Sequence, residues 1–352
     1  MFHKALWMRN QKLGSPAVWA IYISLFLFLP YSFFGKAQSM LAEKRNPYPD
    51  SPENYYLNFH FIGADIVLFL FLIVGLAALL IGSERTTHAT DLTFSLPFKR
   101  KDIFLSKWMF GVVHIISGLL LNLLLCMLIV KFTILSEVVN STFILEFMTI
   151  VIPFSIAIFS FSLFIGTIAG SLVSQLLLSG IFLFFPIGFL MLIINFLEFH
   201  GVSLYNVNNL ESTQAFKDII TSLTLPMSII DFRYFVDVSA GNEMNSVNRI
   251  PFVMLFIPLI YTVISVFIGT YLFSRTKNEN NGRLLVFERG RGFFTFGVIL
   301  CFALTFGMLG GGIFGGYNSP SLIGYYLSAT IGGVLAFLML KKLIHIRMQF
   351  GK

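Results

Sequence analysis

One glycine run in the chain has the spacing of a nucleotide site. Gly310 to Gly315 reads Gly-Gly-Gly-Ile-Phe-Gly and matches the G-x-G-x-x-G pattern of dinucleotide-binding turns. In such sites the pattern follows a β-strand and opens a helix, so that backbone N–H groups meet the pyrophosphate. Here the run lies inside a long apolar stretch with no strand pattern before it. It therefore predicts helix packing, and no cofactor is expected.

The remaining residue types that perform chemistry are scattered. The sequence contains no G-x-x-x-x-G-K-[ST] pattern, so this chain is not expected to bind ATP phosphates. Its six histidines lack metal-ligand spacing, and Cys126 and Cys301 lie in apolar runs, so neither a metal site nor a disulfide is predicted. No nucleophile, base and acid form a recognisable set. The chain is predicted to be non-catalytic.

Small residues at helical spacing suggest close helix contacts. Gly307, Gly311 and Gly315 are four residues apart, which places them on one helix face where a second helix can approach closely. Gly166 and Gly170 form a shorter version of the same pattern. Both sets are interpreted as packing devices.

The composition sets the class of protein. Of the 352 residues, 56% are hydrophobic and only 12% are charged; 42 are Phe and the mean hydropathy is +0.82. Soluble chains average about 25% charge. Too few polar residues remain to coat a globule of this size. A soluble enzyme, a disordered chain and a secreted disulfide scaffold are excluded.

Eight apolar stretches are long enough to cross a bilayer, which takes roughly 20 residues of helix. The fourth and fifth are nearly continuous, divided only around Gly170–Ser171. The prediction is an all-α polytopic membrane protein, one permease-like domain over residues 1–352, with spans at about 16–35, 62–82, 108–130, 146–170, 172–197, 252–273, 294–315 and 321–340.

Basic residues assign the orientation. With the N-terminus inside, 17 of the 24 Lys and Arg residues fall on the cytosolic side, whereas the outer segments hold most of the acids. The positive-inside rule therefore predicts both termini in the cytosol. The net charge of +7 is spread over four membrane-flanking segments, so no nucleic-acid partner is expected. The lipid bilayer is the expected surrounding.

Three segments outside the spans are expected to have structure. Residues 1–15 are basic, contain Trp7 and predict an interfacial helix, with a frayed start as the alternative. The outer loop 198–250 predicts two short helices. The first runs from Thr213 to a stop at Pro226, and the second runs from Ser228 through about Val238. These would rest on the outer ends of the spans or form a small extracellular cap.

The internal loops differ in what they suggest. Loop 274–293 contains an apolar patch, Arg283 to Arg289, which lies on lipid or contacts a cytosolic partner. Loop 83–107 predicts a short helix over Asp91–Ser95, which Pro97 ends, and a second helix start at Lys101–Asp102. By charge alone, this loop is also compatible with an ordinary positive-inside connection.

Loop 83–107 contains a recognisable motif, formed by Glu84, Thr86 or Thr87, Leu92, Ser95, Leu96, Pro97, Arg100, Asp102 and Lys107. With this motif the loop resembles the corresponding loop of the ABC-2 type permease family, the type V membrane subunits of ABC exporters. The resemblance covers the layout of residues 1–275, and the eight-span form is also similar to the paired Ytr-type permeases of Gram-positive bacteria. Two spans beyond the family's usual six, at about 294–340, depart from its pattern.

The resemblance implies a function and partners. Residues 86–96 would form a coupling helix that docks on a separate ABC ATPase subunit, and two permease subunits, identical or paralogous, would form the pathway in the plasma membrane. Phe-rich spans with little buried charge favour an amphipathic or hydrophobic cargo. Two alternatives remain: an ion-coupled secondary transporter, which would follow a gradient and ignore ATP, and a sensor or scaffold subunit, which would bind a peptide without flux.

Overall fold

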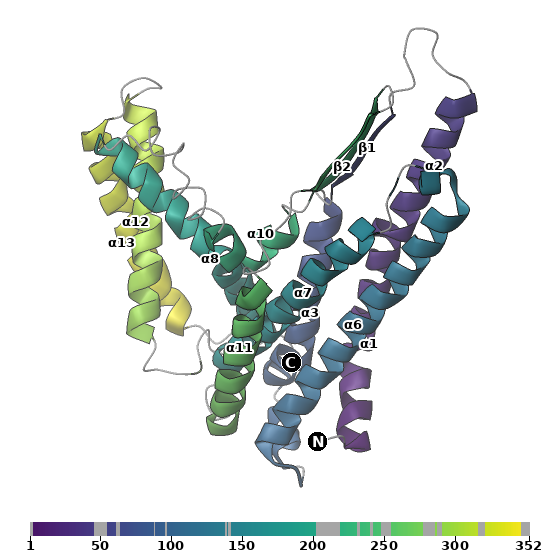
Figure 1. The fold of residues 1–352 in the computed structure, drawn as a ribbon. Helices are drawn as coiled ribbons and strands as arrows, with labels where there is room; N and C mark the ends of the chain where they lie inside the picture. Colours follow the sequence, from purple (N-terminus) through teal and green to yellow (C-terminus); the bar gives the residue numbers. More distant parts are fainter. Residues whose placement is uncertain are drawn as a thin grey trace. The chain divides into compact units, whose positions relative to one another are not determined.

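The computed structural model forms two compact units whose segments alternate along the chain (Figure 1). Unit 1 comprises Met1–Leu80, Pro97–Phe164 and Leu225–Ser274, and unit 2 comprises Ile81–Leu96, Ile165–Thr224 and Arg275–Lys352. The single domain expected over 1–352 stays a prediction. The structure describes residues 3–45, 55–60, 64–87, 89–95, 97–137, 139, 142–201, 219–230, 233–239, 242–247, 255–276, 286, 291–315 and 321–345.

Helices dominate both units. Unit 1 contains α1 (Lys4–Phe28), α2 (Pro30–Arg45), α3 (Ala64–Leu80), α6 (Arg100–Phe132), the 3-10 helix η1 (Ile134–Glu137), most of α7 (Thr142–Ile168), α10 (Leu225–Ile230) and α11 (Phe256–Arg275). Unit 2 contains α4 (Gly82–Thr86), α5 (Thr90–Phe94), the end of α7, α8 (Leu172–Phe199), α12 (Arg291–Gly315) and α13 (Leu322–His345).

The chain is a polytopic helical membrane protein. Within the described residues, seven helices are long and apolar enough to cross a bilayer, and each coincides with one of the eight predicted spans. The remaining predicted span, 62–82, corresponds to α3, which has 17 residues and is shorter than the roughly 20 residues that a span usually takes. At 1.5 Å per residue α3 rises about 25 Å, close to the thickness of the hydrocarbon core. The predicted break at Gly170–Ser171 separates α7 from α8.

The N-terminal segment differs from its prediction. Residues 4–15 are the beginning of α1, which continues through Pro16 to Phe28, so the described part of this segment is not a separate interfacial helix. Asn10 is buried and its side-chain amide donates to Ser106 Oγ over 3.3 Å, while the Trp7 ring stacks on His114. These contacts hold the start of α1 against α6, and the continuous helix follows from this packing.

The outer segments also form a three-stranded antiparallel sheet, which the sequence did not predict. β1 (Tyr55–His60) pairs with β2 (Arg233–Ser239), which pairs with β3 (Asn242–Val247). The predicted helix from Ser228 to Val238 is wrong, because α10 ends at Ile230 and the chain then forms β2. Aromatic and β-branched residues in Arg-Tyr-Phe-Val-Asp-Val favour a strand once a partner strand is available.

The first outer helix is partly described. Residues 219–223 are helical, whereas the predicted start at Thr213 lies outside the described residues. Pro226 was expected to end this helix, but it lies in the first turn of α10. That position suits proline, since the first-turn N–H groups have no partner within the helix.

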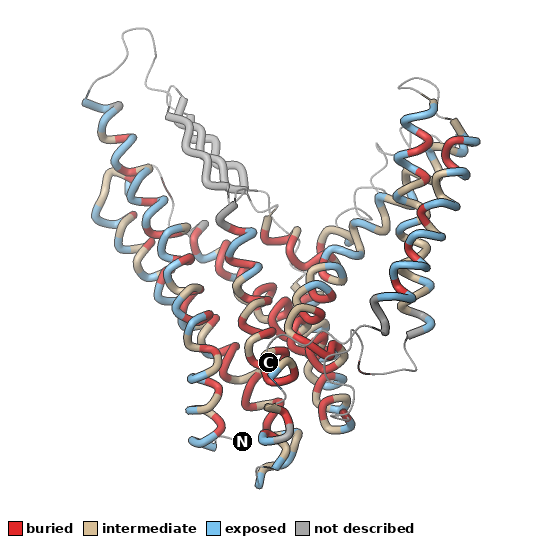
Figure 2. Tube along the Cα trace, turned by 180° about the vertical axis from the view of Figure 1, so that it is seen from behind, coloured by how far each residue is buried: buried red, intermediate tan, exposed pale blue. Residues whose placement is uncertain are grey.

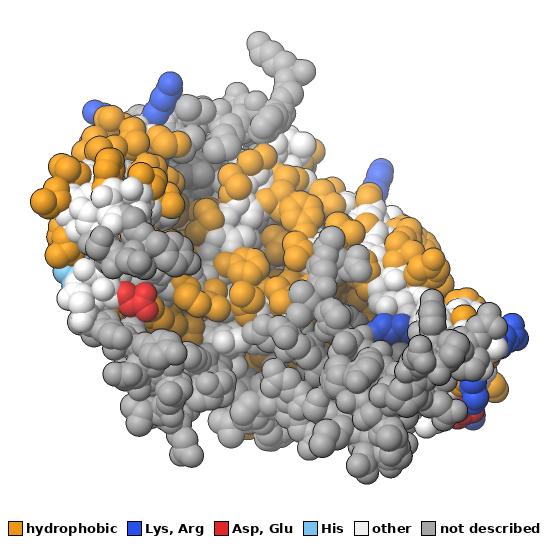
Figure 3. All heavy atoms as spheres, turned by 90° about the horizontal axis from the view of Figure 1, so that it is seen from above, with side chains coloured by type: hydrophobic (Ala, Val, Ile, Leu, Met, Phe, Trp, Pro, Cys, Tyr) orange, Lys and Arg blue, Asp and Glu red, His pale blue; other side chains and the backbone are white. Residues whose placement is uncertain are grey.

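Figure 2 shows exposed positions along the helices of each unit, and many of these positions hold large apolar residues. Ile313 on α12, Ile323 on α13 and Phe267 on α11 are each about three-quarters exposed, at 76%, 75% and 75%. Hydrophobic side chains cover much of the described surface in Figure 3, and Lys and Arg lie mainly toward its edges. Lipid tails accept such a surface at no cost, whereas water does not.

Within unit 2, glycines bring α12 close to its neighbours, but not as a single face. Gly307 lies against the Tyr325 ring of α13, and Gly311 lies against Phe199 of α8. Gly315 is the last residue of α12 and is half-buried. Gly310, outside the expected set, makes the tightest approach: a Cβ there would overlap Ser328 Oγ and lie 2.8 Å from the Gly324 carbonyl oxygen. Gly166 lies against Gln175, whereas Gly170 follows the end of α7 and shares no helix face with it.

Replacing Gly310 by alanine is expected to destabilise the α12–α13 pair by about 1–3 kcal/mol, because a backbone oxygen cannot move aside as a side chain can. Gly312→Ala is the matched control, since nothing lies within 4 Å of its added Cβ on the same helix. We expect this control to be neutral or stabilising through helix propensity. Unfolding of the detergent-solubilised protein by dodecyl sulfate titration measures both, and equal effects would contradict the prediction.

Candidate coupling site

The segment after α3 is a buried turn of helix. α4 contains Glu84 and Arg85, whose side chains are 2% and 1% exposed. Two charged residues so deep in unit 2 require partners, since an unpaired buried charge is costly. Their surroundings therefore determine what α4 does.

The Arg85 guanidinium caps the carboxyl end of α7. It donates one hydrogen bond from Nη1 to the Ala169 carbonyl and another, of 3.1 Å, from Nη2 to the Thr167 carbonyl. Carbonyls in the last turn of a helix lack intrahelical donors and carry the negative end of the helix dipole, so a cation is stabilising there. Arginine suits the place because one planar group reaches both oxygens.

The charge of Arg85 persists at neutral pH. Burial lowers the pKa of Arg85 from its usual value to about 10, and the neighbouring Glu84 carboxylate opposes that shift. A pKa of about 10 leaves the guanidinium protonated at physiological pH. The hydrogen bonds to α7 are therefore charge-assisted, the stronger class of hydrogen bond.

Thr86 links α4 to the start of α8. Its hydroxyl donates to the Gly82 carbonyl over 2.9 Å and accepts the Leu172 N–H over 2.9 Å. Thr87, which the motif could not distinguish from Thr86, is exposed, and its hydroxyl donates to the Ser83 carbonyl within the same turn. The structure thus separates the two threonines: Thr86 reaches α8.

Close backbone packing completes the contact between α4 and α8. A Cβ on Gly82 would lie 2.7 Å from Leu172 Cα, so only glycine permits α4 to approach α8 this closely. Ser171 caps α8 through a reciprocal pair of hydrogen bonds with Ser174. Val286 from the loop 274–293 is buried, and its N–H donates to the Ile168 carbonyl over 2.8 Å. That residue of the apolar patch therefore packs on the protein itself.

We call the region formed by Gly82, Arg85, Thr86 and the α7–α8 turn the joint. Its parts come from three segments that the topology prediction assigns to the cytosolic side: loop 83–107, the fourth-to-fifth span turn and loop 274–293. The strands β1, β2 and β3 come from segments assigned to the outer side, and they pair with one another. Segments that are predicted to lie on the same side of the membrane therefore contact one another. This agrees with a topology in which every predicted span, including α3, crosses the bilayer.

α5 follows the joint and has one buried and one exposed face. Thr90 and Thr93 are 4% and 0% exposed, whereas Leu92 between them is 72% exposed. Ser95 is exposed, and its hydroxyl donates to the Leu92 carbonyl over 2.9 Å. Leu92 is therefore an exposed leucine on a segment predicted to face the cytosol. This face is available to a partner.

The last part of the motif belongs to unit 1. Pro97 is exposed, Arg100 donates from Nη1 to the Ser274 carbonyl over 3.4 Å, and Asp102 lies in the first turn of α6, where an acid favours the helix dipole. Lys107 is 1% exposed, and its amino group donates to the Leu80 carbonyl at the end of α3. Leu96 lies outside the described residues.

The motif residues therefore divide into two groups. Glu84 is buried in α4 and Thr86 belongs to the joint, both within unit 2, where Arg85, which the motif does not include, lies between them in the sequence. Lys107 and Arg100 fix α6 to the ends of α3 and α11 within unit 1.

Sequence reasoning missed several residues of the joint. Arg85 was counted as a positive-inside charge, and Gly82 was not singled out. Ser171 carried a usable signal, since a serine directly before an apolar run is a common N-cap. The carbonyls of Thr167 and Ala169 carry no sequence signal, because any residue type supplies them.

Two curated proteins resemble this chain over most of its length. The probable ABC transporter permease YtrC of Bacillus subtilis (strain 168) is 27% identical over 255 residues, which cover 72% of this chain and 71% of the relative. The probable ABC transporter permease YtrD of the same organism is 26% identical over 285 residues, or 81% of this chain and 78% of the relative. No protein-family model matches the chain, and no solved structure matches it. The chain is thus a multi-pass membrane protein similar to proteins named as probable ABC transporter permeases.

Proposed function

We propose that this chain is an ABC-2 type permease subunit of an ABC exporter in the plasma membrane, driven by ATP hydrolysis in a separate ATPase subunit. A second permease subunit, identical or paralogous, would complete the pathway. The similarity to YtrC and YtrD supports the transporter class. The single observation that carries the coupling role is Leu92, which is 72% exposed on a helix whose opposite face is buried.

The joint provides a route for mechanical coupling. A partner that binds the exposed face of α5 would push on α4, since only three residues separate the end of α4 from the start of α5. α4 is attached to the end of α7 through Arg85 and to the start of α8 through Thr86. ATP-driven closure of the ATPase subunits would then favour one arrangement of α7 and α8 over another, which is a shift in population.

The cargo is proposed to be amphipathic or hydrophobic. The helices carry many large apolar side chains, and buried charged side chains are confined, within the described residues, to Glu84, Arg85 and Lys107. All three lie in loop 83–107, which is predicted to be cytosolic, so they offer no charged path across the bilayer. An ion or a sugar would need polar groups along its path.

Leu92→Asp is expected to abolish association with the ATPase. Burying one leucine in an interface contributes about 1.5–3 kcal/mol, and a carboxylate in its place must be desolvated. We therefore expect at least a roughly tenfold loss of ATPase co-purifying with the tagged chain, measured by quantitative mass spectrometry. Leu92→Met should retain the partner.

Ile219→Asp is the matched control, because Ile219 is also exposed, at 43%, but belongs to the predicted outer loop. It should leave co-purification unchanged. Wild-type chain that retains no ATPase, or a folded Leu92→Asp chain that retains it fully, would overturn the coupling role. Transport that persists without ATP and stops with a protonophore would instead favour a secondary transporter.

A further inference from the structure

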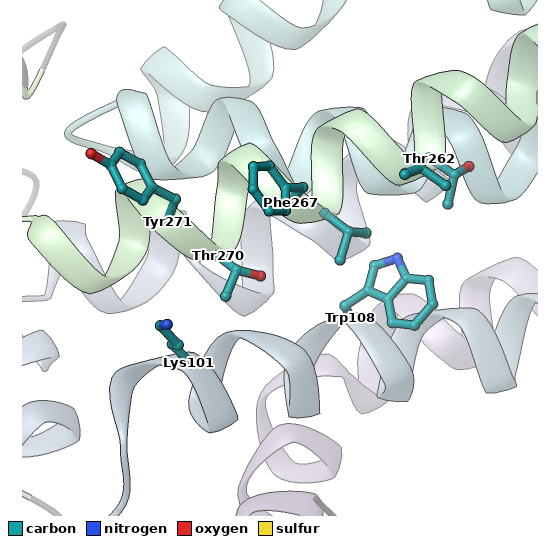
Figure 4. Close-up of a pocket in the computed structure, with 8 residues that line it drawn as sticks. Lys101, Trp108, Thr262, Phe267, Thr270 and Tyr271 are labelled. Atoms are coloured by element: carbon teal, nitrogen blue, oxygen red, sulfur yellow. The ribbon is translucent and has the colours of Figure 1, made fainter.

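A cavity of about 500 Å³ lies between α6 and α11 within unit 1 (Figure 4). Lys101 and Trp108 line it from α6, and Thr262, Phe267, Thr270 and Tyr271 line it from α11. In the view of Figure 4, Lys101 and Thr270 lie toward one end of the lining, and Trp108 and Thr262 lie toward the other. The cavity takes no part in the proposed coupling site.

Direct helix contacts fix the walls of this cavity. The Phe104 ring of α6 fits against Gly269 of α11, where a Cβ would lie 2.6 Å from its nearest ring atom. Phe104 and Phe273 also pack with ring centroids 5.6 Å apart. Because these contacts join the helices beside the cavity, its width is set by packed side chains.

The lining has an apolar part and a small set of available donors. Val263 and Phe267 are 68% and 75% exposed, so the cavity opens toward lipid. The Trp108 indole N–H donates to Ser160 Oγ over 2.8 Å, and the Thr262 hydroxyl donates to the Pro258 carbonyl over 2.8 Å. These two polar groups are therefore occupied within unit 1.

Two donors remain at one end. The Thr270 hydroxyl is buried and has no hydrogen-bond partner among the described residues. The Lys101 ammonium is exposed, and no acidic group in the described part of the chain pairs with it. A cation next to a donor without a partner is suited to an anionic oxygen, such as that of a phosphate.

The depth of the cavity matches a lipid. The predicted orientation places the start of α6 and the end of α11 at the cytosolic face, so Lys101 and Thr270 lie near headgroup level. Val263 is seven residues earlier on α11, about 10 Å deeper in the bilayer. The site is thus cationic at the headgroup level and apolar at the level of the acyl chains. Basic pockets between spans on this side bind anionic headgroups.

We propose that the cavity binds an anionic phospholipid from the cytosolic leaflet. Lys101 binds the phosphate, Thr270 donates a second hydrogen bond, and the acyl chains lie along Val263, Phe267 and the Trp108 ring. This assignment requires only that the chain spans a membrane in the predicted orientation. It is independent of ATPase coupling, so either proposal can fail alone.

Native mass spectrometry of the purified full-length chain tests the proposal. The chain is incubated in mixed micelles with phosphatidylglycerol or phosphatidylcholine, and the retained lipid is counted. We expect selective retention of phosphatidylglycerol, and Lys101→Ala should weaken it about fivefold, the effect of one interfacial charge. Lys99→Ala is the matched control: it removes an equal charge two residues away, outside the cavity lining, and should retain the lipid.

Val266→Trp provides a second variant, because Val266 lines the cavity and the larger ring would fill it. It should reduce phosphatidylglycerol retention while every surface charge is kept. Equal retention of both lipids, or an equal loss in Lys99→Ala and Lys101→Ala, would overturn the proposal. A cross-linking experiment provides a further test, with Phe267→Cys introduced into a chain that lacks the two native cysteines. A disulfide between two such chains whose yield is not lowered by added phosphatidylglycerol would also overturn the proposal. That result would assign the cavity to a second copy of the chain.

Discussion

Replacing Arg85 by alanine is expected to cost about 3–5 kcal/mol of folding free energy, the largest effect of any substitution discussed. The change removes both charge-assisted donors from the Thr167 and Ala169 carbonyls and leaves the buried Glu84 without the adjacent cation. Arg85→Lys should recover only part of the loss, since an ammonium lacks the planar fork that reaches both oxygens. Dodecyl sulfate titration of the solubilised protein measures the stability.

Arg45→Ala serves as the control for Arg85→Ala, because Arg45 is an exposed arginine at the end of α2. It should change stability by less than about 0.5 kcal/mol. If the proposed coupling role is right, Arg85→Lys should lower cargo-stimulated ATP hydrolysis more than it lowers ATPase binding, because that proposal assigns the ATPase contact to α5 and the transmission of movement to the joint. Full stability of Arg85→Ala would contradict the buried arrangement of α4.

Lys107→Ala is expected to produce the second largest loss of stability. The Lys107 amino group donates to the Leu80 carbonyl, and its side chain is almost fully buried between α6 and the end of α3. Lys107→Met keeps much of the volume and removes the donor, so it isolates the cost of an unsatisfied carbonyl, about 1–3 kcal/mol. Lys107→Ala should cost more than Lys107→Met, because it also leaves a cavity.

The control for Lys107 lies on the same helix. Lys131 is exposed near the far end of α6, and Lys131→Ala should leave the unfolding titration unchanged. If Lys107→Met proved as stable as the wild-type protein, the amino group would contribute no net stabilisation and α3 would be fixed to α6 by packing alone. That packing includes Gly14 of α1, where an added Cβ would lie 2.8 Å from the Phe110 ring of α6 and 3.2 Å from Leu76 of α3.

Together these two substitutions test the parts of loop 83–107 that belong to different units. Arg85 acts within unit 2, where it fixes α4 to the end of α7. Lys107 acts within unit 1, where it fixes α6 to α3. Both alanine substitutions are expected to lower the amount of folded protein, Arg85→Ala more than Lys107→Ala. The milder Arg85→Lys is the variant expected to impair transport more than ATPase binding.

The hydropathy pattern alone determined the class of this protein and the positions of its membrane helices. Apolar stretches near 20 residues long must form helices in lipid, because every backbone N–H and C=O needs an internal partner there. The break at Gly170–Ser171 and the short helix α5 were also predictable, but from local signals. Ser171 caps α8, and Pro97 prevents α5 from continuing. Local chemistry fixed these features.

Only the tertiary structure decided the sheet, the continuous α1 and the joint. β2 is a strand because β1, more than 170 residues earlier, supplies its hydrogen-bond partners, and no local pattern carries that information. Arg85 looks like any cytosolic charge until α7 presents two carbonyls to it. Gly310 lies closer to α13 than Gly311 does, because the rotation of α12 about its own axis determines which residue faces α13. The spacing of the glycines does not fix that rotation. Periodicity specifies which residues share a face, and packing alone specifies what that face meets.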